Sequence, residues 1–141
     1  MPQHSYHYIL VDGHIVVAAG DHKFLIDTGS PFSFGDAPSF FFAGKTHGMQ
    51  HGLLRDMMQT ISENVGEKID ALIGGDILNQ YDIIIEPAAA AFVLSDEEAP
   101  IKGDVIHTES VLRVPMLEAI VGGGTILVFL DTGAKLSYLD P

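Results

Sequence analysis

The stretch Phe24-Leu25-Ile26-Asp27-Thr28-Gly29-Ser30 decides the fold expected for this chain. It is an apolar run that ends abruptly in a carboxylate, a small hydroxyl residue and a glycine. The pattern returns at Val128-Phe129-Leu130-Asp131-Thr132-Gly133-Ala134, at an offset of 104 positions (131 − 27). The same offset aligns three further pairs, Val17 with Val121, Ser33 with Ser137 and Phe34 with Tyr138. Two apolar strands that each deliver an aspartate into a glycine turn predict a pair of carboxylates.

Composition narrows the class of protein. The 141 residues suffice for one domain with a core, or one domain and part of another, and 47% of them are hydrophobic, which favours a packed globule. The absence of cysteine excludes disulfides and thiolate chemistry. A net charge of −12 disfavours nucleic acid and anionic membranes as partners.

The first residues and the apolar runs of the sequence are where targeting and membrane-spanning patterns occur. No apolar run approaches the roughly 20 residues of a membrane helix. Residues 1–7 lack a basic region followed by an apolar core, so we expect no signal peptide, no membrane partner and a cytoplasmic location.

Short strands dominate the expected secondary structure. Residues 6–11, 15–19 and 23–26 predict three antiparallel strands, and Asp12-Gly13 between the first two is a strong hairpin signal. Further expected elements are a helix from Leu53 ended by Gly66, a mobile loop over 44–52, strands over 82–86 and 91–94, and a second hairpin over 111–130.

Two carboxylates a few Å apart cannot both ionise readily, so one keeps a proton while the other loses it. Such a pair supplies a general base and a general acid together, and a water between them can attack a carbonyl. One Asp-Thr-Gly alone is weak evidence, because aspartate and glycine favour any turn. The repeat and its matching apolar strands favour the catalytic interpretation.

These residues resemble the catalytic loops of aspartic proteases, both pepsin-like and retroviral-like. A third segment, residues 72–78 (LIGGDIL), is similar to the apolar-apolar-Gly segment that passes each catalytic loop in that family. The resemblance implies hydrolysis of a peptide or protein substrate by an activated water, with no metal, cofactor or covalent intermediate. The implied catalytic residues are Asp27 and Asp131, and the implied supporting residues are Thr28, Gly29, Ser30, Thr132, Gly133 and Ala134. The threonines would lock the loops together, and the glycines would donate N–H groups to the carboxylates.

The resemblance also implies a fold and its limits in the chain. We expect a mainly β protein, with an acid-protease lobe closed into a β-barrel and carrying one or two short helices. Residues 1–97 would form this lobe, 98–110 a linker, and 111–141 the start of a second lobe. Because the second repeat ends ten positions after Asp131 (141 − 131), we expect a fragment of a longer protein.

Several alternatives stay open at this level. Family members close a glycine-tipped hairpin, the flap, over the substrate, and the residues proposed to contact substrate are Gly44, Gly48, Ile73 and Gly74. Two copies would form a homodimer if the dyad paired Asp27 of each chain. A different class of function is a non-catalytic interaction or dimerisation domain on the same fold.

The remaining motifs favour structural roles. Phe32, Phe34 and residues 40–42 form an aromatic run that we assign mainly to the core, with an exposed binding patch as the alternative. His47 and His51 have the four-residue spacing of metal ligands on a helix, but the neighbouring glycines favour solvated loop histidines.

Overall fold

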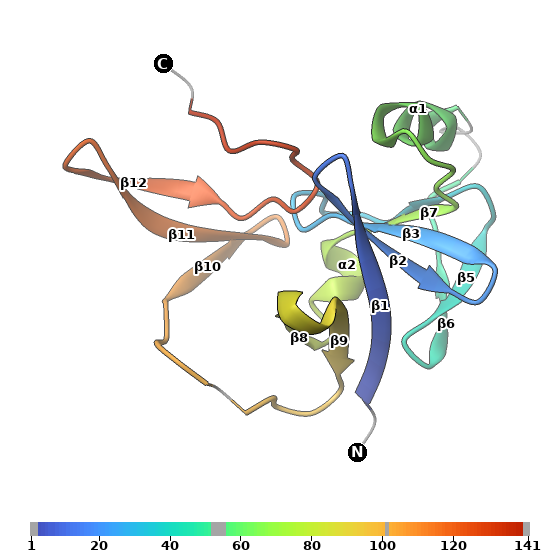
Figure 1. Cartoon of the computed structure of the whole chain (residues 1–141), viewed down its shortest axis with the longest axis horizontal. Coiled ribbons are helices and arrows are strands. Elements are labelled where there is room, and N and C mark those ends of the chain that lie inside the picture. Colours follow the sequence, from blue (N-terminus) through green and yellow to red (C-terminus); the bar gives the residue numbers. More distant parts are fainter. Residues whose placement is uncertain (1–2, 52–55, 101, 140–141) are drawn as a thin grey trace.

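The protein is mainly β in this computed structural model, which describes residues 3–51, 56–100 and 102–139 (Figure 1). The first strands are β1 (Gln3–Val11), β2 (His14–Ala19), β3 (His22–Ile26), β4 (Phe34–Gly35), β5 (Ser39–Phe42) and β6 (Lys45–Gly48). The later strands are β7 (Ala71–Ile73), β8 (Asp82–Glu86), β9 (Ala91–Ser95), β10 (Thr108–Val111), β11 (Val114–Val121) and β12 (Gly124–Phe129). The helices are α1 (Met57–Val65), α2 (Gly75–Leu78) and a 3-10 turn, η1 (Pro87–Ala89).

A seven-stranded sheet forms the framework, in the order β4-β7-β3-β2-β1-β9-β8. The predicted antiparallel strands β1 to β3 are confirmed, and the turn at Asp12-Gly13 has positive φ angles of 50° and 80°. The predicted closed barrel is wrong. The sheet is open, because β4 and β8 form its two edges and no described strand connects them.

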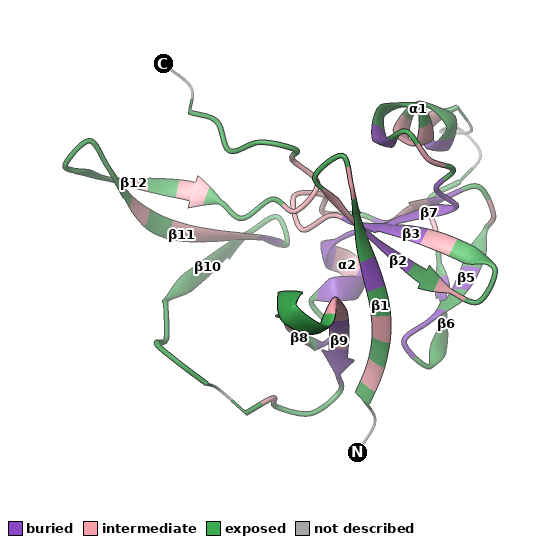
Figure 2. Cartoon of the chain, in the orientation of Figure 1, coloured by how far each residue is buried: buried purple, intermediate pink, exposed green. Residues whose placement is uncertain are grey.

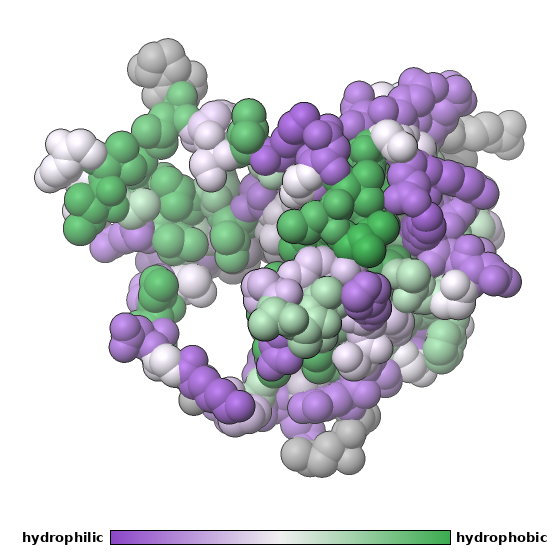
Figure 3. Space-filling view, in the orientation of Figure 1, coloured by the Kyte–Doolittle hydropathy of each residue, from purple (hydrophilic) through white to green (hydrophobic). Residues whose placement is uncertain are grey.

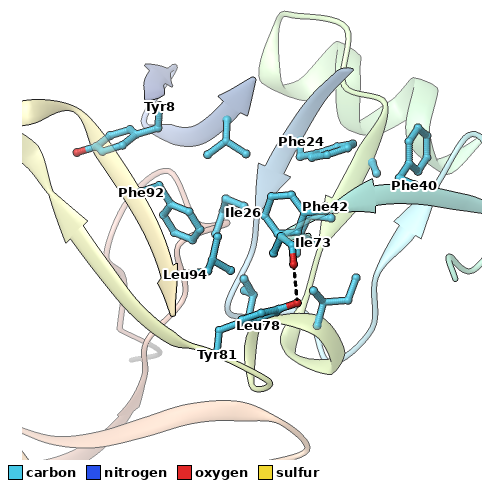
Figure 4. Packing of buried hydrophobic residues seen from close by; sticks show 14 residues of the cluster. Tyr8, Phe24, Ile26, Phe40, Phe42, Ile73, Leu78, Tyr81, Phe92 and Leu94 are labelled. Carbon is cyan, nitrogen blue, oxygen red and sulfur yellow. Dashed lines mark hydrogen bonds between the residues drawn. The ribbon is translucent and has the colours of Figure 1, made fainter. Parts of the chain in front are cut away.

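The core lies against both faces of this sheet. On one face, Phe24, Phe42 and Phe92 are fully buried and pack with Ile26 and Ile73 (Figure 4). On the other, helix α1 covers a smaller cluster in which Met58 and Val65 are buried with other apolar residues of the sheet. Successive residues of β3 and β7 point to opposite faces and are both buried (Leu25 beside Ile26, Leu72 beside Ile73), as cover on both faces of the sheet requires.

The other strands form two smaller sheets, β10-β11-β12 and β5-β6. Residues 108–110, predicted as the end of the linker, belong to β10. In the three-stranded sheet only Val114 is buried, whereas most residues of β3 and β7 in the seven-stranded sheet are buried (Figure 2). Within the described residues, no helix combines the length and apolarity needed to cross a membrane.

The β5-β6 hairpin replaces most of the loop expected over residues 44–52. Its turn is fixed because the Ala43 N–H donates to Tyr6 Oη at 2.8 Å, and Tyr81 Oη donates to the Ala43 carbonyl at 3.3 Å. His47 on β6 is 6% exposed and bonds through Nε2 to the Phe42 carbonyl, so the solvated position expected for it is wrong. The aromatic run is divided: Phe40 and Phe42 lie in the core, while Phe32 and Phe41 are exposed. Leu53 and Leu54, which began the expected helix, lie outside the described residues.

Candidate active site

Strands β3 and β12 deliver the two aspartates into turns of the same form. In the first loop (residues 27–30), the Ser30 N–H donates to the Asp27 carbonyl at 3.3 Å. In the second loop (residues 131–134), the Ala134 N–H donates to the Asp131 carbonyl at 3.3 Å. Each apolar strand thus ends where its aspartate begins a tight turn, as the repeat predicts.

Four hydrogen bonds from the two threonines join the loops. The Thr28 N–H donates to Thr132 Oγ1 at 3.0 Å, and the Thr132 N–H donates to Thr28 Oγ1 at 3.0 Å. Each hydroxyl then donates across to the opposite strand end, Thr28 to the Leu130 carbonyl at 2.5 Å and Thr132 to the Ile26 carbonyl at 2.8 Å. Both hydroxyls therefore use a donor and an acceptor function, which fixes the loops to each other with near two-fold symmetry.

The glycines allow the loops to approach this closely. A Cβ built on Gly29 would collide with the Asp131 carboxyl group, and one on Gly133 would collide with that of Asp27. Each glycine N–H donates to the carboxylate of its own loop, at 2.9 Å in both cases. The third residue of each loop is therefore restricted to glycine by the aspartate that faces it.

The two carboxyl groups behave as a pair. The pKa of Asp27 is raised from 3.8 to about 6, first by burial and then by the charge of Asp131 and a side-chain hydrogen bond to it. Hydrogen bonds from the Gly29 and Ser30 N–H groups oppose this shift. A carboxyl group that stays neutral beside a second carboxylate is suited to hold and release one proton near neutral pH.

The first loop has a buried support that the sequence did not reveal. Ser33, 0% exposed, donates through Oγ to Asp76 Oδ1 at 2.6 Å and accepts the Gly74 N–H at 2.9 Å. The Gly75 N–H donates to the Ser30 carbonyl at 2.7 Å, which ties α2 to the loop. The signal in the sequence is the pair of polar residues beside the two predicted segments, but their separation of 43 positions hides the contact.

The four residues proposed to contact substrate lie in two places, the β5-β6 hairpin and the segment beside the first loop. Gly44 faces the His4 ring at the tip of β5-β6, and Gly48 ends β6 with open space around it. Ile73 is 0% exposed, and its carbonyl accepts the Asp27 N–H at 3.0 Å. Gly74 faces the carbonyls of Ser30 and Phe32. Ile73 and Gly74 therefore support the first loop from within the protein.

Two further contacts join the sheets beside the paired loops. Lys135 Nζ forms an ion pair with Asp12 at 2.7 Å, next to the β1-β2 turn. The Arg113 guanidinium, in the β10-β11 turn, lies over the Phe32 ring at 5.2 Å. Each hairpin turn thus contacts the segment that follows the opposite loop.

The described residues contain no group of three His, Cys, Asp or Glu side chains arranged to hold a metal ion. Asp27 is half-buried and Asp131 is exposed, so the pair lies at the surface with its second member in contact with solvent. Comparisons with protein-family models, curated proteins and solved structures find no match.

Proposed function

We propose that this chain carries the catalytic pair of an aspartic endopeptidase, with Asp27 and Asp131 sharing one proton. The observation that carries the proposal is the reciprocal Thr28–Thr132 bonding, which holds the two aspartate loops together in one chain. The raised pKa of Asp27 supports it, because the pair then retains a proton up to about pH 6. We also propose, from the resemblance of the loops, that the chain is related to the acid-protease family.

The proposed reaction needs only these two side chains and water. The ionised carboxylate removes a proton from a water that attacks the peptide carbonyl carbon, while the protonated carboxyl donates its proton to the carbonyl oxygen. The C–N bond then breaks as the leaving nitrogen receives the proton that the first carboxylate took from the water. The other carboxylate takes a hydroxyl proton from the intermediate, which releases the carboxylic acid product and restores the resting pair. Because Asp27 is the more buried carboxyl and has the raised pKa, we assign it the proton in the resting pair.

The test is cleavage of a peptide library across a pH series. We expect cleavage at acid pH that falls about tenfold per unit above about pH 6, because the shared proton is lost there. Asp27→Asn and Asp131→Asn should each abolish cleavage, and Asp104→Asn, an exposed aspartate outside both loops, should not change it. Cleavage that survives both loop substitutions would refute the proposal.

A second candidate is a non-catalytic interaction or dimerisation domain on the same framework. It is favoured by the exposed apolar side chains of the three-stranded sheet, which include Leu127 and Phe129. Absence of cleavage by a folded wild-type protein at every pH would support this candidate. The homodimer with a dyad of two Asp27 residues is less favoured, because Asp131 already faces Asp27 within one chain.

A further inference from the structure

Strand β12 has an open edge. Its equivalent, β3, lies between β2 and the parallel strand β7, whereas β12 pairs only with β11. The Leu130 N–H donates to Pro115 on β11, so the N–H groups of Phe129 and Asp131 alternate toward the open side. β12 has no charged residue and no proline, the features that usually protect an edge strand.

The ladders show which residues of the two sheets are equivalent. Val17 pairs with Phe24 as Leu117 pairs with Val128, and the neighbouring pairs follow the same register. Leu25 and Ile26 on β3 are 4% and 1% exposed, while their equivalents Phe129 and Leu130 are 58% and 48% exposed. Figure 3 shows apolar side chains gathered at the surface over β11 and β12. Positions buried in one sheet are thus uncovered in the other.

The first sheet shows what covers such an edge. Strand β7 lies parallel to β3, and the segment that continues through Gly74 and Gly75 bonds to the Asp27 N–H and the Ser30 carbonyl. The equivalent groups in the second loop are the Asp131 N–H and the Ala134 carbonyl. No described residue forms a hydrogen bond with either of them. One segment of this kind would satisfy both groups and cover Phe129.

We propose that the β12 edge binds an apolar polypeptide segment of the Ala71–Gly75 pattern, laid parallel to β12. A folded second copy of the chain cannot supply the segment, because its own Ala71 and Ile73 are fully buried. The proposal does not depend on catalytic activity.

The probe is a synthetic peptide of residues 69–81, added to the wild-type protein. We expect saturable binding of one peptide per chain by calorimetry, and at least about tenfold slower hydrogen exchange at the Phe129 and Asp131 amides. Phe129→Lys should weaken binding by at least about tenfold, whereas Phe41→Lys, an equally exposed phenylalanine on β5, should not change it.

Three results would overturn the proposal. The first is no peptide binding with unchanged exchange along β12. The second is equal binding by Phe129→Lys and wild type. The third is a wild-type dimer in sedimentation that Phe129→Lys dissociates, which would mean that a second copy covers this edge. If Phe129→Lys fails to fold, peptide binding and hydrogen exchange of the wild-type protein still test the proposal through the first result.

Discussion

At the scale of single residues, the raised pKa of Asp27 couples the stability of the fold to pH. The folded state holds this proton up to about pH 6, whereas the unfolded chain releases it near 3.8. The stability it contributes is therefore complete below the lower value and declines as pH rises through the higher one. At neutral pH the wild-type protein carries the penalty of two ionised carboxylates in contact.

Asp27→Asn should remove this penalty. The amide oxygen can still accept the Gly29 N–H, and the amide nitrogen can donate to Asp131. We expect stabilisation on the order of 1 kcal/mol at about pH 8, after allowance for solvent screening, and none at about pH 3.5. Thermal unfolding at both pH values measures this, with Asp104→Asn as the exposed control. A variant less stable than wild type at about pH 8 would contradict the proton-sharing pair.

Gly29→Ala tests the close approach of the loops. The added Cβ collides with the Asp131 carboxyl, so the loops must separate and the Asp27 carboxyl loses its partner. We expect destabilisation of about 1–3 kcal/mol and loss of any peptidase activity. Gly124→Ala is the matched control, because its Cβ would meet only the Val121 carbonyl at 3.7 Å. Equal denaturation midpoints for the two variants would contradict the geometry.

The sequence predicted contacts between neighbouring residues and between repeated motifs, but it did not predict contacts between single residues far apart in the chain. The repeat predicted that Asp27 and Asp131 belong together, and the structure brings their carboxyl groups into contact. The contact between Ser33 and Asp76 was not predicted, because serine and aspartate are ordinary turn residues. Ser33 repeats as Ser137, but Asp76 has no repeat that would mark it as the partner. The burial that selects their hydrogen bond exists only after folding.

At the scale of elements, the two loops depend on their threonines. Thr28→Val and Thr132→Val each remove one hydroxyl that accepts a cross-loop N–H and donates to a carbonyl. We expect each variant to lose about 1–3 kcal/mol, because backbone groups of the opposite loop lose their partners. The double variant should lose less than the sum, since either change already separates the loops. Urea unfolding of the four proteins measures the coupling, and strict additivity would contradict a joined pair.

The strand pattern was predictable, but its register was not. The offset of 104 holds for β3 and β12, whereas β2 and β11 are offset by 100 (114 − 14), because the second hairpin extends further beyond the loops. Val17 is therefore equivalent to Leu117, and the predicted match with Val121 is wrong. The glycines and histidines of residues 44–52 predicted a loop where the β5-β6 hairpin forms. The hairpin is stabilised by Phe40 and Phe42, which pack in the core.

At the scale of the whole molecule, the paired loops join a seven-stranded sheet with a buried core to a three-stranded sheet that is mostly exposed. The turns at Asp12-Gly13 and Leu112-Arg113 are equivalent, and both have two positive φ angles. Each reaches the opposite half, through the Asp12–Lys135 ion pair and the Arg113–Phe32 contact. Leu112 and Arg113 hold a conformation that favours glycine, at φ angles of 50° and 66°. The second sheet thus depends on the first for its position.

Native-state hydrogen exchange should reveal this dependence. Phe24 and Val128 occupy equivalent ladder positions, but Phe24 lies in a buried core and Val128 in a sheet whose edge is open. We expect the Val128 amide to exchange by local opening, at least about tenfold faster than that of Phe24, which corresponds to roughly 1.4 kcal/mol. Low concentrations of denaturant should accelerate hydrogen exchange of the Phe24 amide far more than that of the Val128 amide, because only global unfolding exposes the Phe24 amide to solvent. The same rate and the same denaturant dependence at both amides would show that the two sheets unfold as one unit, and would contradict this account of the molecule.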